Sequence, residues 1–241
     1  MNLLLLEPDE VTTSGEVRLA GRRLLHAREI LGVEVGASIR VGVRGGQVGQ
    51  GEVVSISEQE MVVRVLLSEA PPRRPGIDLL LAFPRPKALR RIFPAIASFG
   101  IDRVVLVNAA QVEKSYFASP LIAADSVREL FSLGMEQARD TVAPELIVEP
   151  RFRPFVEDRL DSMFPDSRRL LAHPGTPSLL TRGSEMQRTV LAVGPDGGWV
   201  PFELELLRAR GFQDFSLGER PLRTEVAIPA LLGALLSKQV T

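Results

Sequence analysis

Hydrophobic positions follow two different patterns along the chain. In the first seventy residues they fall in short segments that are rich in β-branched residues and separated by glycine turns such as Gly45-Gly46, which predicts strands. These segments are residues 3–6, 40–43, 51–56 and 61–67. One helix is expected over residues 22–30, ending before Gly32. Since short antiparallel strands bury one face each, we expect a small β-barrel with one helix.

A break follows at residues 70–76, where three prolines and a glycine exclude a regular element. Beyond it, continuous hydrophobic runs that are typical of buried parallel strands alternate with helical segments. The expected strands are 77–83, 103–107, 146–148, 169–172, 189–193 and 212–217. The expected helices are 87–99, which Pro94 kinks or shortens, 119–140, 201–210 and 225–239. This alternation predicts an α/β fold with a mainly parallel sheet. We therefore expect a β-barrel domain at 1–70, a linker at 71–76 and an α/β domain at 77–241.

Composition narrows the class of protein. Hydrophobic residues make up 45% of the chain and charged residues 24%, which is ordinary for a globular protein. No stretch approaches the roughly 18 uninterrupted apolar residues of a membrane span, and no basic region precedes the apolar run at 3–6, so a signal peptide is not predicted. With no cysteine and only His26 and His173, disulfides and thiolate chemistry are excluded and no metal is expected. We expect a cytoplasmic protein.

The net charge is −1, but cationic side chains cluster after the break. Between residues 73 and 91 a single acid, Asp78, opposes Arg73, Arg74, Arg85, Lys87, Arg90 and Arg91. A local cluster of this kind can bind phosphate. Judged by charge alone, a solvated surface is the more common explanation.

The candidate ligand-binding and catalytic residues lie where predicted strands end, because ligands bind there in open α/β sheets. Val193 ends a buried strand and is followed by Gly194-Pro195-Asp196-Gly197-Gly198. Glycines let a ligand approach the backbone closely. No Gly-Lys-Ser/Thr follows, and the glycine spacing differs from the dinucleotide-binding fingerprint. The loop is therefore either a small-molecule loop or a tight strand-to-helix turn.

Two further strand ends carry polar residues. After the strand near Leu217, a charged loop leads into the last helix, where Thr224 is expected as the N-cap and Glu225 suits the positive helix end. Arg223 gains nothing from the helix dipole, which makes it a candidate ligand for a phosphate, a carboxylate or a base carbonyl. His173, before Pro174, ends another strand and is more often structural than catalytic in such a place.

Taken together, these loops resemble one family. Val193 to Gly198 is similar to its Gly-Pro-Glu-Gly-Gly loop, with Asp196 for Glu, and Leu217-Gly218 with Leu222 to Glu225 is similar to its Leu-Gly…Leu-Arg-Thr-Glu segment. The family is that of the RsmE-type 16S ribosomal RNA uracil-N3 methyltransferases of the SPOUT superfamily. Further likenesses are His173-Pro174, the segment Gly134 to Arg139 that resembles a Glu-Gln-x-x-Arg helix, and Lys87, and a looser one in the N-terminal part is His26 with Leu31 and Gly36. The likeness covers essentially the whole chain.

The resemblance implies a SPOUT-type α/β domain whose C-terminal part is threaded through a loop as a deep trefoil knot, an exception to the rule of unknotted chains. It implies a PUA-like β-barrel RNA-binding domain before it, and a homodimer with the site near the dimer interface. S-adenosyl-L-methionine (SAM) would sit bent within the knot, held largely by backbone groups of the three loops. The residues assigned to the cofactor are Ala172, His173, Pro174, Val193, Gly194, Pro195, Gly197, Gly198, Leu217, Gly218, Leu222 and Thr224.

The implied activity is methylation of N3 of a uridine in small-subunit ribosomal RNA. The N3 proton must leave, and negative charge that develops on O2 or O4 must be stabilised, for which Arg223 is the candidate. Glu225 is expected to orient Arg223, cap the helix or help move the proton. The target base must also leave its stack. The candidate RNA contacts are Arg22, Arg23, His26, Arg85, Lys87 and Arg139.

Departures from the family pattern fall mainly on RNA-facing positions. Gly32 replaces an arginine, Phe99 lies within Ser-Phe-Gly instead of Glu-Leu-Gly, Lys114 replaces an arginine, and Thr141 stands where another arginine is usual. Two alternatives therefore stay open. The first is a methyltransferase of the same fold that acts on another RNA position. The second is a catalytically inactive RNA-binding or ribosome-assembly factor that does not bind SAM. A general nucleotide-binding α/β enzyme lacks the phosphate loop it would need.

Overall fold

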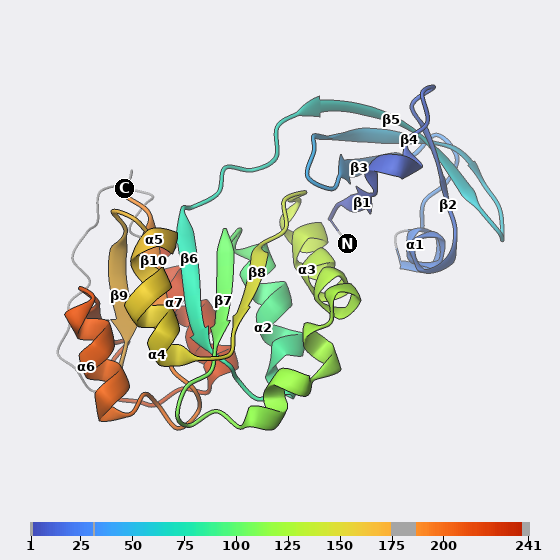
Figure 1. Cartoon of the computed structure of the whole chain (residues 1–241). Helices are drawn as coiled ribbons and strands as arrows, with labels where there is room; N and C mark the ends of the chain where they lie inside the picture. Colours follow the sequence, from blue (N-terminus) through green and yellow to red (C-terminus); the bar gives the residue numbers. More distant parts are fainter. Residues whose placement is uncertain (1, 31, 175–186, 238–241) are drawn as a thin grey trace. The chain divides into compact units, whose positions relative to one another are not determined.

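The computed structural model describes residues 2–30, 32–174 and 187–237. The chain forms two compact units (Figure 1). The N-terminal unit comprises Met1–Arg73 together with Ser132–Ala143, and the C-terminal unit comprises Arg74–Phe131 and Pro144–Thr241. The boundary between Arg73 and Arg74 falls in the proline-rich segment, as expected. The inclusion of Ser132–Ala143 in the N-terminal unit was not expected.

The N-terminal unit is built on a five-stranded sheet of order β1-β3-β4-β5-β2. Its strands are β1 (Leu4–Leu6), β2 (Glu16–Leu19), β3 (Ser38–Val43), β4 (Val48–Ile56) and β5 (Met61–Glu69). Neighbouring strands are antiparallel except for the parallel pair β1 and β3, so the expectation of antiparallel strands alone was wrong at this edge. Strand β2 was not predicted, because only Val17 and Leu19 mark its buried face.

The predicted helix at 22–30 is present as α1 (Gly21–Leu25), which continues as a π-helical turn (His26–Ile30). Leu24 and Ala27 face the sheet and join a core that includes Leu6, Val41 and Met61. Burial of these side chains supplies the main favourable term in folding of the unit.

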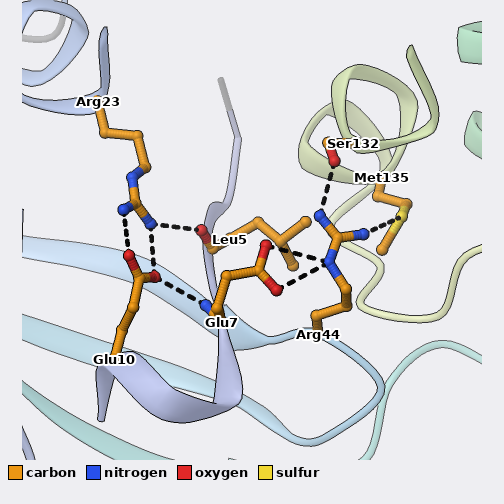
Figure 2. Close-up of polar contacts among 7 residues, drawn as sticks. All are labelled: Leu5, Glu7, Glu10, Arg23, Arg44, Ser132 and Met135. Carbon is orange, nitrogen blue, oxygen red and sulfur yellow. Dashed lines mark hydrogen bonds and ion pairs between the residues drawn. The ribbon is translucent and has the colours of Figure 1, made fainter. Parts of the chain in front are cut away.

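Arg44 ties the segment Ser132–Ala143 to this sheet (Figure 2). Its guanidinium pairs with Glu7 through Nε (3.1 Å to Oε2), donates to Ser132 Oγ at 2.7 Å and approaches Met135 Sδ at 3.8 Å. Thr141 adds a hydrogen bond from its Oγ1 to the carbonyl of Gly46 at 2.6 Å. Thr141, one of the departures from the family pattern, therefore has a structural role here.

The C-terminal unit contains a six-stranded sheet of order β11-β9-β10-β6-β7-β8, in which every pair is parallel. The strands are β6 (Ile77–Ala82), β7 (Arg103–Val107), β8 (Glu145–Glu149), β9 (Arg168–Ala172), β10 (Thr189–Val193) and β11 (Gln213–Phe215). All residues of β6 and β10 are buried, as expected for central strands of a parallel sheet. The predicted α/β fold with a parallel sheet is confirmed for this unit.

Helices connect these strands. They are α2 (Pro86–Ser98), α3 (Ala124–Ala138), α4 (Phe152–Pro154), a π-helical turn (Phe155–Arg159), α5 (Leu160–Met163), α6 (Pro201–Ala209) and α7 (Thr224–Leu236). Pro94 is accommodated inside α2 without breaking it. The predicted helix at 119–140 is shorter, because the 3-10 turn Pro120–Ile122 precedes α3. The helical turns at 152–163 were not predicted. In the part of the chain that the structure describes, no helix is long and apolar enough to cross a membrane.

The order of the strands determines where a ligand can bind. Strand β10 pairs with β9 on one side and with β6 on the other, although β6 precedes it by more than a hundred residues. The chain therefore changes direction across the sheet between β10 and β6, and in parallel sheets ligands bind at such a point beyond the carboxyl ends of the strands.

A buried carboxyl in the N-terminal unit generates a pH-dependent prediction. Burial raises the pKa of Glu136, against the opposing effect of Arg22, which lies 3.7 Å away. The folded state therefore binds this proton more tightly than the unfolded state does. Its stabilising contribution is complete below the ordinary glutamate pKa and is lost as pH rises through the raised value. Lowering the pH from about 7 to about 4 should thus stabilise the wild type relative to Glu136→Gln in urea unfolding.

The matched control is Glu58→Gln, which removes an exposed carboxylate by the same change of residue. The pH dependence of Glu58→Gln should follow that of the wild type. A stability difference between wild type and Glu136→Gln that is the same at both pH values would contradict the assignment.

Candidate active site

Three loops at the carboxyl edge of the parallel sheet enclose a cavity of about 150 Å³. They follow β9, β10 and β11, and the first turns of α7 complete the wall. The cavity is lined by all the residues that were predicted to hold a cofactor except Gly197: Ala172, His173, Pro174, Val193, Gly194, Pro195, Gly198, Leu217, Gly218, Leu222 and Thr224. Loops that lie far apart in the sequence thus form one site.

Gly197 lies on the other side of its loop. A side chain there would meet Gln111, whose Cβ lies 3.4 Å from the position of an added Cβ, and Gly197 is not part of the cavity lining. Gly198 does line it and has a φ of +76°, which favours glycine. The sequence could not distinguish these adjacent glycines, because their side of the loop depends on a turn closed by the bond from Gly198 N to the Pro195 carbonyl at 2.8 Å.

Trp199 forms the floor of the loop after β10. A Cβ added to Gly194 would lie 3.1 Å from both Cδ1 and Nε1 of this indole, so backbone and ring approach closely and a side chain here would force one of them to shift. The ring is buried and packs against Phe152 with 5.5 Å between centroids. Among the described residues, Trp199 Nε1 has no hydrogen-bond partner. A buried donor without an acceptor is costly, and the packing of the ring has to offset that cost.

Several lining residues were not predicted: Asp196, Trp199, Phe215, Ser216, Arg220, Pro221, Ala227 and Leu231. A helical pattern could have identified two of them. Ala227 and Leu231 lie three and seven positions after Thr224 in α7, and this spacing puts the three residues on one helix face.

The start of α7 differs from the prediction. Arg223 is the N-cap, with extended backbone angles (φ −62°, ψ 148°) and no capping bond from its side chain, so the expectation that Thr224 is the N-cap was wrong. Thr224 is the first helical residue, and its Oγ1 donates to Asp196 Oδ1 at 2.9 Å. The hydroxyl therefore joins the helix to the loop after β10 instead of satisfying the backbone of its own helix.

A second hollow, of about 600 Å³, adjoins the cavity. We call it the basic groove; its charged lining residues are Arg85, Lys87, Arg91 and Arg223 with Asp196 and Glu225. Asp196, Pro221 and Leu222 line both the groove and the cavity. With four cationic side chains against two anionic ones, the groove is suited to a polyanion.

The two predicted catalytic residues both line the basic groove. Arg223 is exposed, and its guanidinium makes no hydrogen bond or ion pair within the described part of the chain. Glu225 is largely buried and pairs with Arg91 at 3.7 Å, and no contact with Arg223 is found. The expectation that Glu225 orients Arg223 thus gains no support from the geometry.

Glu203 of α6 holds the loop after β10 in place. Its buried carboxylate accepts hydrogen bonds from Val200 N at 3.1 Å and from Ala110 N at 2.7 Å. This residue was not predicted, since a glutamate in the first helical turn has the ordinary explanation of matching the helix dipole.

The predicted RNA contacts fall in both units. Arg85 and Lys87 line the basic groove, whereas Arg22, Arg23 and Arg139 belong to the N-terminal unit. Arg23 is half-buried and ion-paired with Glu10, as Figure 2 shows, and Arg22 and Arg139 are exposed. The side chain of His26 lies outside the described part of the structure. The described residues contain no group of three or more His, Asp and Glu side chains arranged to hold a metal ion.

A family model described as an RNA methyltransferase domain matches residues 72–236, which is more than half of the chain. The chain belongs to this RNA methyltransferase family. Relatives along the whole chain carry a narrower name. Ribosomal RNA small subunit methyltransferase E of Treponema pallidum is 29% identical over 98% of this chain and 91% of its own. The protein of the same name from Synechocystis is 23% identical over 93% of this chain and 73% of its own.

Solved structures of methyltransferases share the fold. Ribosomal RNA small subunit methyltransferase E from Neisseria gonorrhoeae, bound to S-adenosyl methionine, superposes with a TM-score of 0.77 at 18% identity, covering 98% of this chain and 97% of that one. A methyltransferase from Legionella pneumophila in complex with SAM gives the same TM-score at 20% identity, with 98% and 97% covered. At these identities the likeness concerns the fold.

Proposed function

We propose that the protein transfers a methyl group from SAM to N3 of a uridine in 16S ribosomal RNA of the small subunit. The observation that carries this proposal is the cavity formed by the loops after β9, β10 and β11, whose lining matches the cofactor residues assigned by sequence. The relatives named small subunit methyltransferase E, which align over nearly the whole chain, support the choice of RNA.

The cavity suits SAM chemically. Its lining is mainly apolar, with glycines at 194, 198 and 218 that leave backbone groups accessible to an adenine or ribose. When bound, SAM supplies an electrophilic methyl group on a sulfonium.

We further propose the trefoil knot and the domain roles that the resemblance implies. In support of the knot, the late strand β10 inserts between β9 and β6, and the final helix α7 packs against α2, the helix that follows β6. The segment 1–70 is proposed as a PUA-like RNA-binding domain, joined by the linker 71–76 to the SPOUT domain at 77–241. The five-stranded sheet, accompanied by the 3-10 turn Pro8–Glu10 and by α1 with its π-helical continuation, supports this role.

A homodimer is part of the proposal. Val226, in the first turn of α7, and Leu222, two residues before that helix in the cavity wall, are exposed at 51% and 44%. Large apolar side chains grouped next to a ligand site are typical of a contact surface. A second copy of the chain would cover them.

In the proposed mechanism, the protein positions uracil N3 in line with the methyl group, which lowers the barrier by proximity. Arg223 stabilises the negative charge that develops on O2 or O4, because its planar guanidinium has several fixed donors and no partner among the described residues. Glu225 keeps Arg91 in the groove through their ion pair. The proposed RNA contacts are Arg22, Arg23, His26, Arg85, Lys87 and Arg139. Of these, Arg23 is ion-paired with Glu10.

Mapping of modified nucleotides tests this function. In a strain that lacks the gene, small-subunit RNA should lose one N3-methyluridine, detected by mass spectrometry, and the wild-type gene should restore it. Arg223→Ala should restore little, since loss of one stabilising donor or cation costs about 10²-fold or more in rate. An unchanged set of N3-methyluridines in the deletion strain would contradict the proposal.

Salt dependence tests the groove. The double variant Arg85→Ala/Lys87→Ala should bind small-subunit RNA more weakly, and the slope of log affinity against log salt should fall by about one for each lost phosphate contact. Arg153→Ala, which removes an exposed arginine of the same unit that lies outside the groove, is the control and should keep the wild-type slope. If the double variant keeps that slope too, the groove does not bind the RNA backbone.

A further inference from the structure

The carboxylate of Asp196 lies in the wall between the cavity and the basic groove. Of the acidic side chains in the described part of the chain, it alone lines both. Its Oδ1 accepts the hydrogen bond of Thr224 Oγ1 at 2.9 Å, and its Oδ2 lies 3.0 Å from Arg85 Nε. The side chain is 40% exposed. One oxygen is thus fixed to a buried hydroxyl, and the other faces an exposed cation.

The other acid of the groove is placed differently. Glu225 has 17% of its side chain exposed and pairs with Arg91. It lines the groove but not the cavity. A methyl donor in the cavity and a uracil in the groove would meet at the shared wall, which consists of Asp196, Pro221 and Leu222. The group that takes the N3 proton must reach that meeting point.

We propose that Asp196 is the general base that accepts the N3 proton of the target uracil. This inference rests on the proposed function. The N3–H bond breaks and its proton passes to Oδ2 of Asp196. The N3 electron pair then forms the bond to the methyl carbon, and the electron pair of the broken carbon–sulfur bond remains on sulfur. Asp196 finally releases the proton to water.

The surroundings of Asp196 fit this role. The bond from Thr224 fixes the orientation of the carboxylate without occupying Oδ2. Arg85 is 74% exposed, so its guanidinium can turn from Oδ2 to an RNA phosphate as the substrate binds. Arrival of RNA would then free the base. Arg223, which follows Leu222 of the shared wall and lines the groove, supplies the positive charge for the uracil oxygen.

The proposal is tested by the single-turnover rate of methyl transfer at saturating SAM, measured with RNA that carries uridine or 5-fluorouridine at the target position. Fluorine makes N3–H more acidic, so loss of the general base should slow transfer to 5-fluorouridine less than transfer to uridine. Asp196→Asn keeps an acceptor for Thr224 and should slow transfer to uridine by about 10²-fold or more, with a smaller loss for 5-fluorouridine. Asp196→Glu should keep most of the rate. Glu219→Gln, a nearby exposed carboxylate that lines neither hollow, is the control with wild-type rate.

RNA binding without a methyl donor gives a second readout. When rising pH ionises N3 of 5-fluorouridine, the wild type should lose affinity, because the anion then faces the carboxylate, and Asp196→Asn should not. Equal rate losses for the two nucleotides, or a wild-type rate in Asp196→Asn, would overturn the role of Asp196 while leaving the methyltransferase intact. A wild type that transfers no methyl group to any RNA would overturn the proposed function itself.

Discussion

The site depends on parallel hydrogen bonding of β10 to β9 on one side and to β6 on the other. This pairing brings the loops after β9 and β10 to the same edge as Arg85, which follows β6 by three residues. Glu203 then fixes the loop after β10 through two backbone N–H groups, and Asp196 joins that loop to Thr224 of α7. Without β10 between its two neighbours, the apolar cavity and the basic groove would not share a wall.

In the proposed function, the sharing of that wall lets one edge of the sheet serve two chemically different ligands. The cavity offers glycine backbone, Trp199 and apolar side chains, whereas the groove offers arginines and a lysine. A sulfonium cofactor and a polyanionic RNA need different surroundings, yet their reacting atoms must come within bonding reach. Asp196 and Leu222 stand at the boundary where this is possible.

The sequence predicted most of this architecture because its signals are local. Continuous apolar runs such as Ile77–Ala82 identified the buried strands, and the glycines after Val193 singled out, as a ligand loop or a tight turn, the loop that lines the cavity. Features that depend on distant partners were missed. Pairing of β1 with β3 in parallel, the packing of Ser132–Ala143 on the N-terminal unit and the bond from Thr224 to Asp196 each join residues that no sequence window contains. The same limit explains why Gly197 was grouped with Gly198, although the two face different sides of the loop.

Calorimetric titration of SAM tests the central claim most directly. The wild type should bind one SAM per chain, and Gly194→Val should weaken binding at least about tenfold, since its Cβ would lie 3.1 Å from the Trp199 indole and its branched side chain must push the ring or the loop from its place. Gly233→Ala, in α7, where the added carbon meets nothing within 4 Å beyond the neighbouring backbone of its own helix, is the matched control and should bind SAM as the wild type does. Absence of SAM binding by the wild type, or equal binding by Gly194→Val, would contradict the account.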